Sequence, residues 1–207
     1  MKLYYSPGAC SLSPHIVARE AGLPVELSHV TFAGASRTTA EGENFFEVNP
    51  RGGYVPTLRL DDGSVLIEGP AIIHYLADQA PAKKLLPERG TRSYYDALSW
   101  IAFVNSELHK GYGPLFGKPE PEVRAQVEEK LNKRYAVVEK ALEGKEYLLG
   151  DFSIADAYLY TILRWSHRAN IDFSKYPNLT SFMERMEARP GVAQALKEEG
   201  LDEEGLE

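Results

Sequence analysis

The sequence predicts an α/β domain at the amino end, followed by a second domain built only from helices. Short apolar runs typical of strands alternate with helical patterns up to residue 80, and no strand-like run follows residue 88. Residues 81–88 are polar, contain two prolines and separate the two patterns. The expected organisation is therefore a domain at residues 1–80, a linker at 81–88 and a helical domain at 89–207.

The composition is that of a globular protein, with 43% hydrophobic residues in a chain of 207. Thirty acidic and 23 basic residues give a net charge of −7 without a long basic block, which argues against nucleic acid or a membrane as partner. No apolar run approaches the ~18 residues of a membrane span, and the start lacks the pattern of a signal peptide. With a single cysteine and no internal disulfide, a cytoplasmic location is expected.

The first feature of the chain is a turn at residues 5–11 (YSPGACS), between a strand-like start and a helical pattern that ends at Gly22. Cys10 is therefore expected at the amino end of a helix. Unpaired amides and the helix dipole favour an anion there, so a thiolate of Cys10, or one brought by a ligand, is stabilised. A pKa ~2 units below the ordinary ~8.5 leaves most of a thiol ionised at pH 7. The alternative is a small apolar core cysteine.

The next segments complete a strand, helix and strand unit, which is typical of a parallel crossover. Residues 25–30 alternate apolar and polar side chains, as a half-buried strand does. A polar stretch at residues 34–44 follows, in which Arg37 is the only cation. A short helix is expected around residues 45–48, before the turn chemistry of residues 49–53.

A hairpin is predicted from residues 54–60 and 65–67, reversed at Asp61-Asp62-Gly63. Pro56, near the start of the first strand, is compatible with a cis Val55-Pro56 bond or with a trans proline in an edge strand. The cis turn would leave the backbone N–H and C=O of Val55 to an extended peptide ligand.

Glu68-Gly69-Pro70 begins a helix that ends near residue 80. The carboxylate of Glu68 is either an ordinary charge at a helix start or a group that binds a ligand ammonium, while the exposed amides bind a carboxylate.

The second half of the chain is predicted to form successive helices. One starts at Thr91 and ends at Gly111, and its period places Ser106 and His109 on a face of small and polar residues. Another begins at Pro121, and two more follow, the first of them capped by Ser153 with Asp156 as its reciprocal partner and the last ending before residues 189–191. The aromatic and methionine residues of these helices are interpreted as core.

Taken together, the order of these segments resembles cytosolic glutathione transferases, over roughly residues 1–200, and most closely the bacterial beta class. The resemblance rests on several short motifs that are weak alone and specific in this order and spacing: residues 5–15 (YSPGACSLSPH), 49–52 (NPRG), 55–56 (VP), 68–69 (EG), 106–112 (SELHKGY) and 150–158 (GDFSIADAY). It implies a thioredoxin-like first domain that binds glutathione, a helical second domain that forms the wall of an electrophile site, and a homodimer.

Within the first domain, the resemblance implies that Cys10 meets the glutathione sulfur and that Val55, on a cis Pro56 turn, pairs with the cysteinyl backbone. Glu68 and Gly69 are expected to hold the γ-glutamyl group. Arg37 is expected to face the glycyl carboxylate, and Tyr54 is expected to lie beside the tripeptide. Tyr5 and Ser11 are alternative hydrogen-bond donors to the sulfur.

Within the second domain, Ser106, Glu107 and His109 match the helix that closes over the glutathione site, with His109 as a donor near the sulfur. Tyr112 and Phe116 are expected on an exposed surface that forms the electrophile pocket. Two departures from the family pattern stand out. Ala102 replaces an asparagine, and the Gly52-Gly53 loop is one residue longer.

The expected function is conjugation of the glutathione thiolate to small hydrophobic electrophiles, a detoxifying transferase reaction with glutathione as co-substrate. Two alternatives remain: a thiol redox enzyme in which Cys10 forms a mixed disulfide, resolved by a second glutathione, and a non-catalytic binder of hydrophobic ligands. No metal is expected, because the five histidines show no ligand spacing and there is no second cysteine. Neither a dinucleotide-binding nor a serine-hydrolase motif is present. The natural electrophile is not encoded in any motif.

Overall fold

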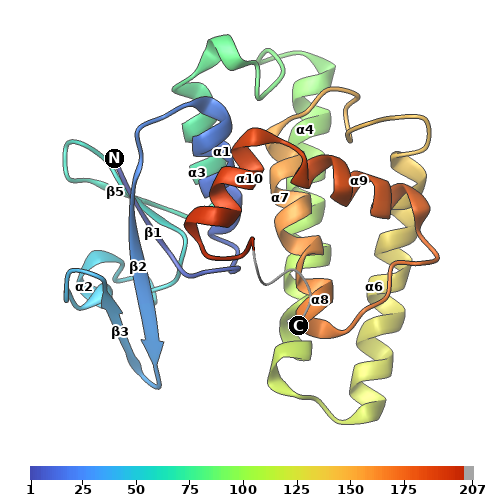
Figure 1. The fold of residues 1–207 in the computed structure, drawn as a ribbon, viewed down its shortest axis with the longest axis horizontal. Coiled ribbons are helices and arrows are strands. Elements are labelled where there is room, and N and C mark those ends of the chain that lie inside the picture. The colour runs from blue at the N-terminus through green and yellow to red at the C-terminus, as the bar shows by residue number, and fades with distance from the viewer. Residues whose placement is uncertain (203–207) are drawn as a thin grey trace. The chain divides into compact units, whose positions relative to one another are not determined.

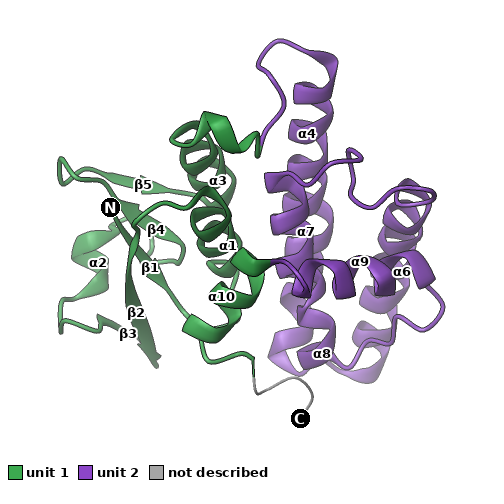
Figure 2. Ribbon diagram, turned by 45° about the horizontal axis from the view of Figure 1, so that its top comes forward, with its two compact units in different colours: residues 1–85, 190–207 green, residues 86–189 purple. Residues whose placement is uncertain are grey.

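The computed structural model describes residues 1–202, which form two compact units (Figures 1 and 2). Unit 1 comprises Met1–Leu85 together with the chain from Pro190, and unit 2 comprises Leu86–Arg189. Within the described residues, no helix is both long and apolar enough to cross a membrane.

Unit 1 is an α/β unit with a five-stranded sheet in the order β3-β2-β1-β4-β5. Its elements are β1 (Lys2–Tyr5), α1 (Leu12–Ala21), β2 (Glu26–Ala33), β3 (Ser36–Thr39), α2 (Phe45–Val48), β4 (Thr57–Arg59), β5 (Val65–Ile67), α3 (Gly69–Asp78), η1 (Pro81–Lys83) and α10 (Pro190–Glu198). Strands β1 and β2 are parallel and β4 and β5 are antiparallel, which confirms the predicted crossover and hairpin. Strand β3, which pairs with β2, was not predicted. A polar edge strand is held by backbone hydrogen bonds, so its sequence carries no apolar alternation that would reveal it.

Helix α10 packs against α1 within unit 1 (Figure 2). It buries Val192, Ala195 and Leu196. The sequence instead assigned residues 89–207 to the helical domain, and it did not resolve α10 as a separate helix. An apolar face shows that a helix is covered, but not by which element. Residues 203–207 of that expected domain lie outside the described residues.

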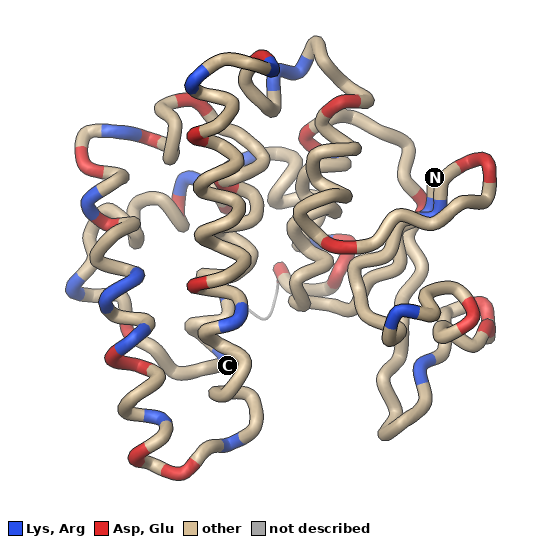
Figure 3. Tube along the Cα trace, turned by 180° about the vertical axis from the view of Figure 1, so that it is seen from behind, with Lys and Arg blue, Asp and Glu red and all other residues tan. Residues whose placement is uncertain are grey.

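Apart from isolated β-bridges within residues 147–151, the elements of unit 2 are helices. Its elements are α4 (Arg92–Phe103), the π-helical segment η2 (Val104–His109), α5 (Lys110–Tyr112), the short 3₁₀ helix η3 (Gly113–Gly117), α6 (Pro121–Ala141), α7 (Ile154–Leu163), α8 (Trp165–Ala169) and α9 (Pro177–Glu187). The predicted cap is confirmed, because Ser153 and Asp156 form a reciprocal capping box at the start of α7. Charges of both signs alternate along α6 (Figure 3), where Arg124 and Glu128 lie 2.7 Å apart one helical turn from each other.

Candidate functional site

The turn that carries Cys10 lies between the end of β1 and the start of α1, and Cys10 itself is half-buried. The thiol of Cys10 donates to the carbonyl oxygen of Val55, 3.3 Å away. The Val55-Pro56 bond is cis, which selects one of the two arrangements that the sequence allowed. The expectation that the Val55 carbonyl is unpaired within the protein is therefore wrong. The Val55 amide, in contrast, has no hydrogen-bond partner among the described residues.

Ser11 is buried, and its hydroxyl is held by the backbone of the same turn. It accepts from the Ser6 amide at 3.1 Å and donates to the Ser6 carbonyl at 3.2 Å. The expected role of this hydroxyl as a donor to sulfur is therefore not supported. The amide of Ser11 has no hydrogen-bond partner among the described residues, so it remains available to an anion at the start of α1.

Tyr5 was the other candidate donor to sulfur. Its ring packs against the rings of His15 and His29, with centroids 6.1 and 5.7 Å away. Burial, followed by the negative charges of Glu199 and Glu198, raises the pKa of Tyr5. Tyr5 therefore packs against two histidine rings, and its role as a donor to sulfur stays a prediction.

Arg37 lies on β3 within an aromatic cage. Its guanidinium carbon is 5.3, 4.9 and 5.0 Å from the ring centroids of Phe32, Phe46 and Tyr54, and Nη1 donates to the Gly52 carbonyl at 2.6 Å. A hollow of about 390 Å³ adjoins it. Arg37 is thus held in place as a cation beside an open space, which fits its expected role toward a carboxylate.

Gly52 and Gly53 let this cage close. Gly52 has a φ of 104°, and a Cβ there would lie 2.6 Å from the ring of Tyr54. Gly53 has a φ of 57°, and a Cβ there would lie 3.0 Å from the ring of Phe46. Both positions therefore favour glycine, because only glycine combines these dihedrals with such close rings.

Glu68 precedes the first residue of α3, and its side chain is exposed without a capping hydrogen bond. Its φ of 71° is uncommon for a residue other than glycine. Such a conformation points to a functional constraint. Gly69 follows, and a Cβ there would make ordinary contact with Pro56, 3.7 Å away. Glu68, Gly69 and Pro56 thus occupy one region of unit 1.

Asn49 contributes to this region, although the sequence suggested only a turn there. Its buried side-chain amide donates to the Tyr54 carbonyl and to the Thr57 hydroxyl, both at 3.0 Å. It therefore joins the two sides of the Val55-Pro56 turn. An asparagine before proline is a common turn signal, so composition alone could not separate this role from an ordinary turn.

His109 ends the π-helical segment η2 in unit 2. Its Nδ1 lies 2.7 Å from the hydroxyl of Tyr158, which in turn donates to Oδ1 of Asn105 at 2.9 Å. With the Tyr158 proton directed to Asn105, this network assigns the proton of the neutral ring to Nδ1 and leaves Nε2 as an acceptor. Burial, and next the charge of Lys110, lower the pKa of His109 to about 4. His109 is thus a neutral acceptor near pH 7, whereas the sequence suggested a donor.

The other two residues predicted on this segment have partners inside unit 2. Ser106 is exposed and donates to the Ala102 carbonyl at 3.0 Å. Glu107 accepts from Nε and Nη2 of Arg134, both at 2.6 Å. The carboxylate of Glu107 therefore holds α6, and Ser106 is the more accessible of the two. Segments with π-helical turns are often functional, which fits the position of His109.

Tyr112 is fully buried, and its hydroxyl accepts from Tyr135 at 2.7 Å. The expectation of an exposed Tyr112 surface is therefore wrong, because the Tyr112 hydroxyl has a hydrogen-bond partner in the core.

Phe116 is 37% exposed and packs edge-on against Trp165, 5.2 Å away. Trp165 also meets His109 at 5.0 Å and was read only as core. Trp165 follows Tyr158 by two helical turns, a spacing that places both side chains on the same side of a helix. This spacing is the signal that could have linked Trp165, like Tyr158, to His109.

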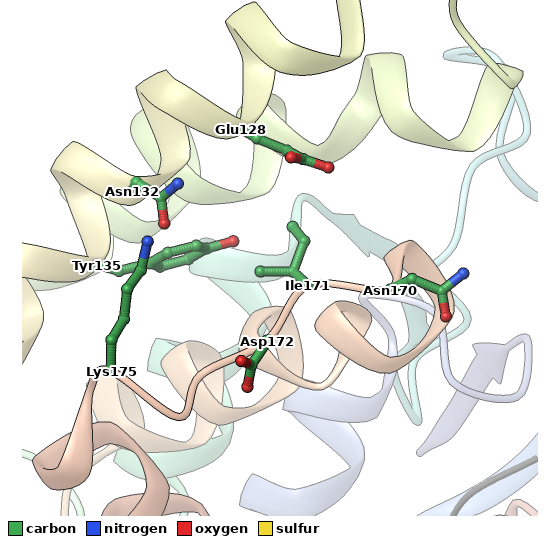
Figure 4. A pocket seen from close by; sticks show the side chains of 7 residues that line it. All are labelled: Glu128, Asn132, Tyr135, Asn170, Ile171, Asp172 and Lys175. Atoms are coloured by element: carbon green, nitrogen blue, oxygen red, sulfur yellow. The ribbon is translucent and has the colours of Figure 1, made fainter. Parts of the chain in front are cut away.

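A separate hollow of about 310 Å³ in unit 2 carries several charged side chains (Figure 4). Each of these has a partner already. Glu128 pairs with Arg124, Asp172 accepts from Ser174, and the ammonium of Lys175 lies 5.3 Å from the ring of Tyr176. We therefore do not assign a ligand to this hollow. Among the described residues there is also no cluster of three or more His, Cys, Asp or Glu side chains that could hold a metal ion.

Two family models match the chain. Residues 8–79 match the glutathione S-transferase N-terminal domain, and residues 100–190 match the glutathione S-transferase C-terminal domain. Among curated proteins, the chain is 43% identical to glutathione S-transferase GstA of Escherichia coli O157:H7, over 97% of this chain and 100% of that protein.

Solved structures agree with this match. The chain is 45% identical to a sphingomonad glutathione S-transferase complexed with glutathione, with a TM-score of 0.90, over 97% of this chain and 100% of that one. It is 42% identical to the bacterial beta class glutathione S-transferase of Sphingomonas chungbukensis, with a TM-score of 0.91 and the same coverage. The similarity therefore extends over both units and includes a structure that contains glutathione.

Proposed function

Because this chain belongs to the bacterial beta class of glutathione S-transferases, we propose that it conjugates the glutathione thiolate to small hydrophobic electrophiles in detoxification. It is a glutathione transferase with a thioredoxin-like unit and a helical unit. The observation that carries the proposal is the unpaired Val55 amide beside the thiol of Cys10, because a peptide ligand that pairs with this amide brings its own sulfur to the same turn.

Glutathione binding is distributed along unit 1. The cysteinyl backbone pairs with Val55 beside Pro56, while Glu68 binds the γ-glutamyl ammonium and the amides at Gly69 bind its carboxylate. Arg37, fixed in its cage with Tyr54, binds the glycyl carboxylate. This arrangement is supported by the exposed carboxylate of Glu68 and the hollow next to Arg37.

The chemical step is a displacement or addition by sulfur. The amide of Ser11 and the start of α1 stabilise the thiolate, and Nε2 of His109 accepts the thiol proton. The thiolate then forms a bond to carbon, and a halide leaves with its electron pair, or an epoxide C–O bond opens. Ser106 is proposed to contact the tripeptide. Phe116 with Trp165, in place of the buried Tyr112, is proposed to line the electrophile pocket.

A steady-state assay tests this proposal. Purified protein is given glutathione with a panel of aryl halides, epoxides and peroxides, and its retention on a glutathione-affinity column is measured in parallel. We expect retention and saturable conjugation of at least one aryl halide or epoxide. Retention without conjugation of any compound would favour the non-catalytic binder, and loss of both would remove the proposal.

A second candidate activity is thiol exchange at Cys10, favoured by the place of its half-buried thiol in the turn before α1. In this reaction the Cys10 thiolate attacks the disulfide between a substrate thiol and glutathione, so that Cys10 takes the glutathione as a mixed disulfide and the substrate thiolate leaves. A second glutathione then attacks this mixed disulfide, which releases Cys10 and forms glutathione disulfide. Mass spectrometry after incubation with glutathione disulfide decides the matter, since an unmodified Cys10 excludes this activity.

We also propose a homodimer and a cytoplasmic location. The family resemblance supports the dimer, and the single cysteine supports a reducing compartment. Light scattering on the purified chain tests the dimer, because a monomeric mass across the micromolar range would contradict it.

A further inference from the structure

The aromatic wall proposed for the electrophile ends in a cation, Arg168 on α8. The ring of Trp165 lies 5.0 Å from the ring of His109 and 5.2 Å from the ring of Phe116. The guanidinium carbon of Arg168 lies over the Phe116 ring, 5.1 Å from its centroid. Three successive contacts, all within unit 2, therefore connect the ring proposed to accept the thiol proton to a positive charge.

Phe116 is supported on the core side and covered at the surface. Its ring is nearly parallel to the ring of Tyr112, with an interplanar angle of 15° and centroids 6.4 Å apart. Tyr112 is fully buried, whereas Arg168 is exposed. The attraction between a guanidinium and an aromatic face holds the long side chain of Arg168 against the wall, although solvent surrounds it.

Arg168 has no carboxylate partner and donates no hydrogen bond among the described residues. Other arginines of unit 2 differ in this respect. Arg164, which directly precedes α8, lies 3.7 Å from Glu187, and Arg134 lies 2.6 Å from Glu107. Stacking on a ring uses none of the five N–H donors of a guanidinium, so those of Arg168 remain available to an acceptor. A carboxylate is the acceptor that matches their planar geometry.

The two segments that carry Phe116 and Arg168 are positive, although the chain has a net charge of −7. Residues 109–118 and 164–171 contain no Asp or Glu. Their Lys and Arg residues are Lys110, Lys118, Arg164 and Arg168. Charges of one sign along a wall raise the local concentration of ligands of the opposite sign. This composition therefore favours an anionic group at the outer end of the wall.

We propose that Arg168 is a specificity-determining residue that selects electrophiles carrying a carboxylate. The substrate class is an activated aryl halide whose carboxylate lies at the opposite end of the ring from the halide. The carboxylate accepts from Arg168, and the ring packs along Phe116 and Trp165. Glutathione sulfur then bonds to the carbon, the halide leaves with the electron pair of its bond, and His109 retains the thiol proton. This inference rests on the proposed function, because it names the electrophiles that the transferase prefers.

A matched pair of substrates tests the inference. The compounds 4-chloro-3-nitrobenzoate and 4-chloro-3-nitrobenzamide share the ring, the nitro group and the leaving group, and they differ in charge. Arg168→Gln removes the cation, and Arg168→Lys keeps the charge without the planar fork. Lys175→Gln is the matched control, because Lys175 is also exposed and lies over a ring, 5.3 Å from that of Tyr176. The measurements are kcat and KM for each compound at low and high salt.

For Arg168→Gln we expect KM for the benzoate to rise about fivefold and KM for the benzamide to stay within about twofold, because only the benzoate loses a charged partner. Arg168→Lys should fall between the wild type and Arg168→Gln, and Lys175→Gln should leave both KM values unchanged. High salt should raise KM of the wild type for the benzoate alone, as for an exposed ion pair.

Equal losses with the two compounds in Arg168→Gln would overturn the inference, because Arg168 would then act only by packing on Phe116. An unchanged KM for the benzoate would also overturn it. A wild type that conjugates only the benzamide would overturn it too, while the proposed function would stand.

Binding of 3-nitrobenzoate and 3-nitrobenzamide, followed by quenching of tryptophan fluorescence, needs no conjugation. If the wild type conjugates neither chloride, the proposed function fails, and this binding pair judges the Arg168 contact by itself. A Kd for 3-nitrobenzoate that rises in Arg168→Gln but not in Lys175→Gln supports the contact, and an unchanged Kd overturns it.

Discussion

The sulfur of Cys10 lies 3.3 Å from the carbonyl oxygen of Val55. A carbonyl oxygen only accepts, so this contact holds the protonated thiol and would repel a thiolate. The proposed stabilisation of an ionised sulfur at the start of α1 therefore requires either that Cys10 has left this contact or that the sulfur belongs to a ligand. The geometry favours glutathione as the source of the reacting thiolate.

Replacement of Cys10 by alanine should leave conjugation largely intact. The Val55 carbonyl is freed and the helix amides remain, so kcat/KM with an aryl halide is expected within about fivefold of the wild type. Cys10→Ser, which retains a donor to Val55, is the matched control. A loss of more than about a hundredfold in both variants would mean that the sulfur of Cys10 takes part in the reaction.

Gly52→Ala should weaken glutathione binding by opening the cage of Arg37. The new Cβ lies 2.6 Å from the ring of Tyr54, so the ring must leave the guanidinium. We expect an increase in KM for glutathione of about tenfold, which corresponds to about 1.4 kcal/mol. Gly63→Ala controls for backbone strain, because Gly63 has a similar φ of 83° and nothing within 4 Å. Equal effects of the two substitutions would contradict this account.

Tyr158→Phe should lower kcat by releasing the ring of His109. Without the hydroxyl, Nδ1 loses its partner at 2.7 Å, and the tautomer with a free Nε2 is no longer selected. We expect a decrease of about tenfold in kcat and an altered pH profile of kcat/KM. Tyr160→Phe, on the same helix but bonded to Arg164 and Glu187, is the control and should keep the wild-type profile. An unchanged pH profile in Tyr158→Phe would argue against the assigned tautomer.

His109 should make the folded protein less stable in mild acid. Its folded pKa of about 4 lies below the ordinary ~6.5, so the unfolded chain binds the proton at higher pH than the folded chain does. The contribution is fully present above pH ~6.5 and declines as the pH falls toward 4, by up to about 3 kcal/mol. Urea unfolding of the wild type and His109→Gln at several pH values measures it. The two stabilities should converge as the pH falls, and a constant difference would contradict the assignment.

Local patterns predicted the elements well where a pattern corresponds to a single kind of structure. The apolar alternation before residue 30, the turn at Asp61-Asp62-Gly63 and the cap at Ser153 all correspond to observed elements. The candidate residues were less completely predicted. Ser11 and Tyr112 were read by residue type as an available hydroxyl and an exposed ring, and both are buried with hydrogen-bond partners.

The sequence by itself determined the strand, helix and strand unit, the hairpin, the family and the turn that carries Cys10, because these depend on local spacing and on motifs. Only the tertiary structure decided that Glu199 reaches Gly8, across 191 positions, and that Tyr158 orients His109. Hydrophobic periodicity states that a face is buried but not against what. Which donor meets which acceptor is fixed only when distant segments pack, and in this protein that packing sets the chemistry of the site.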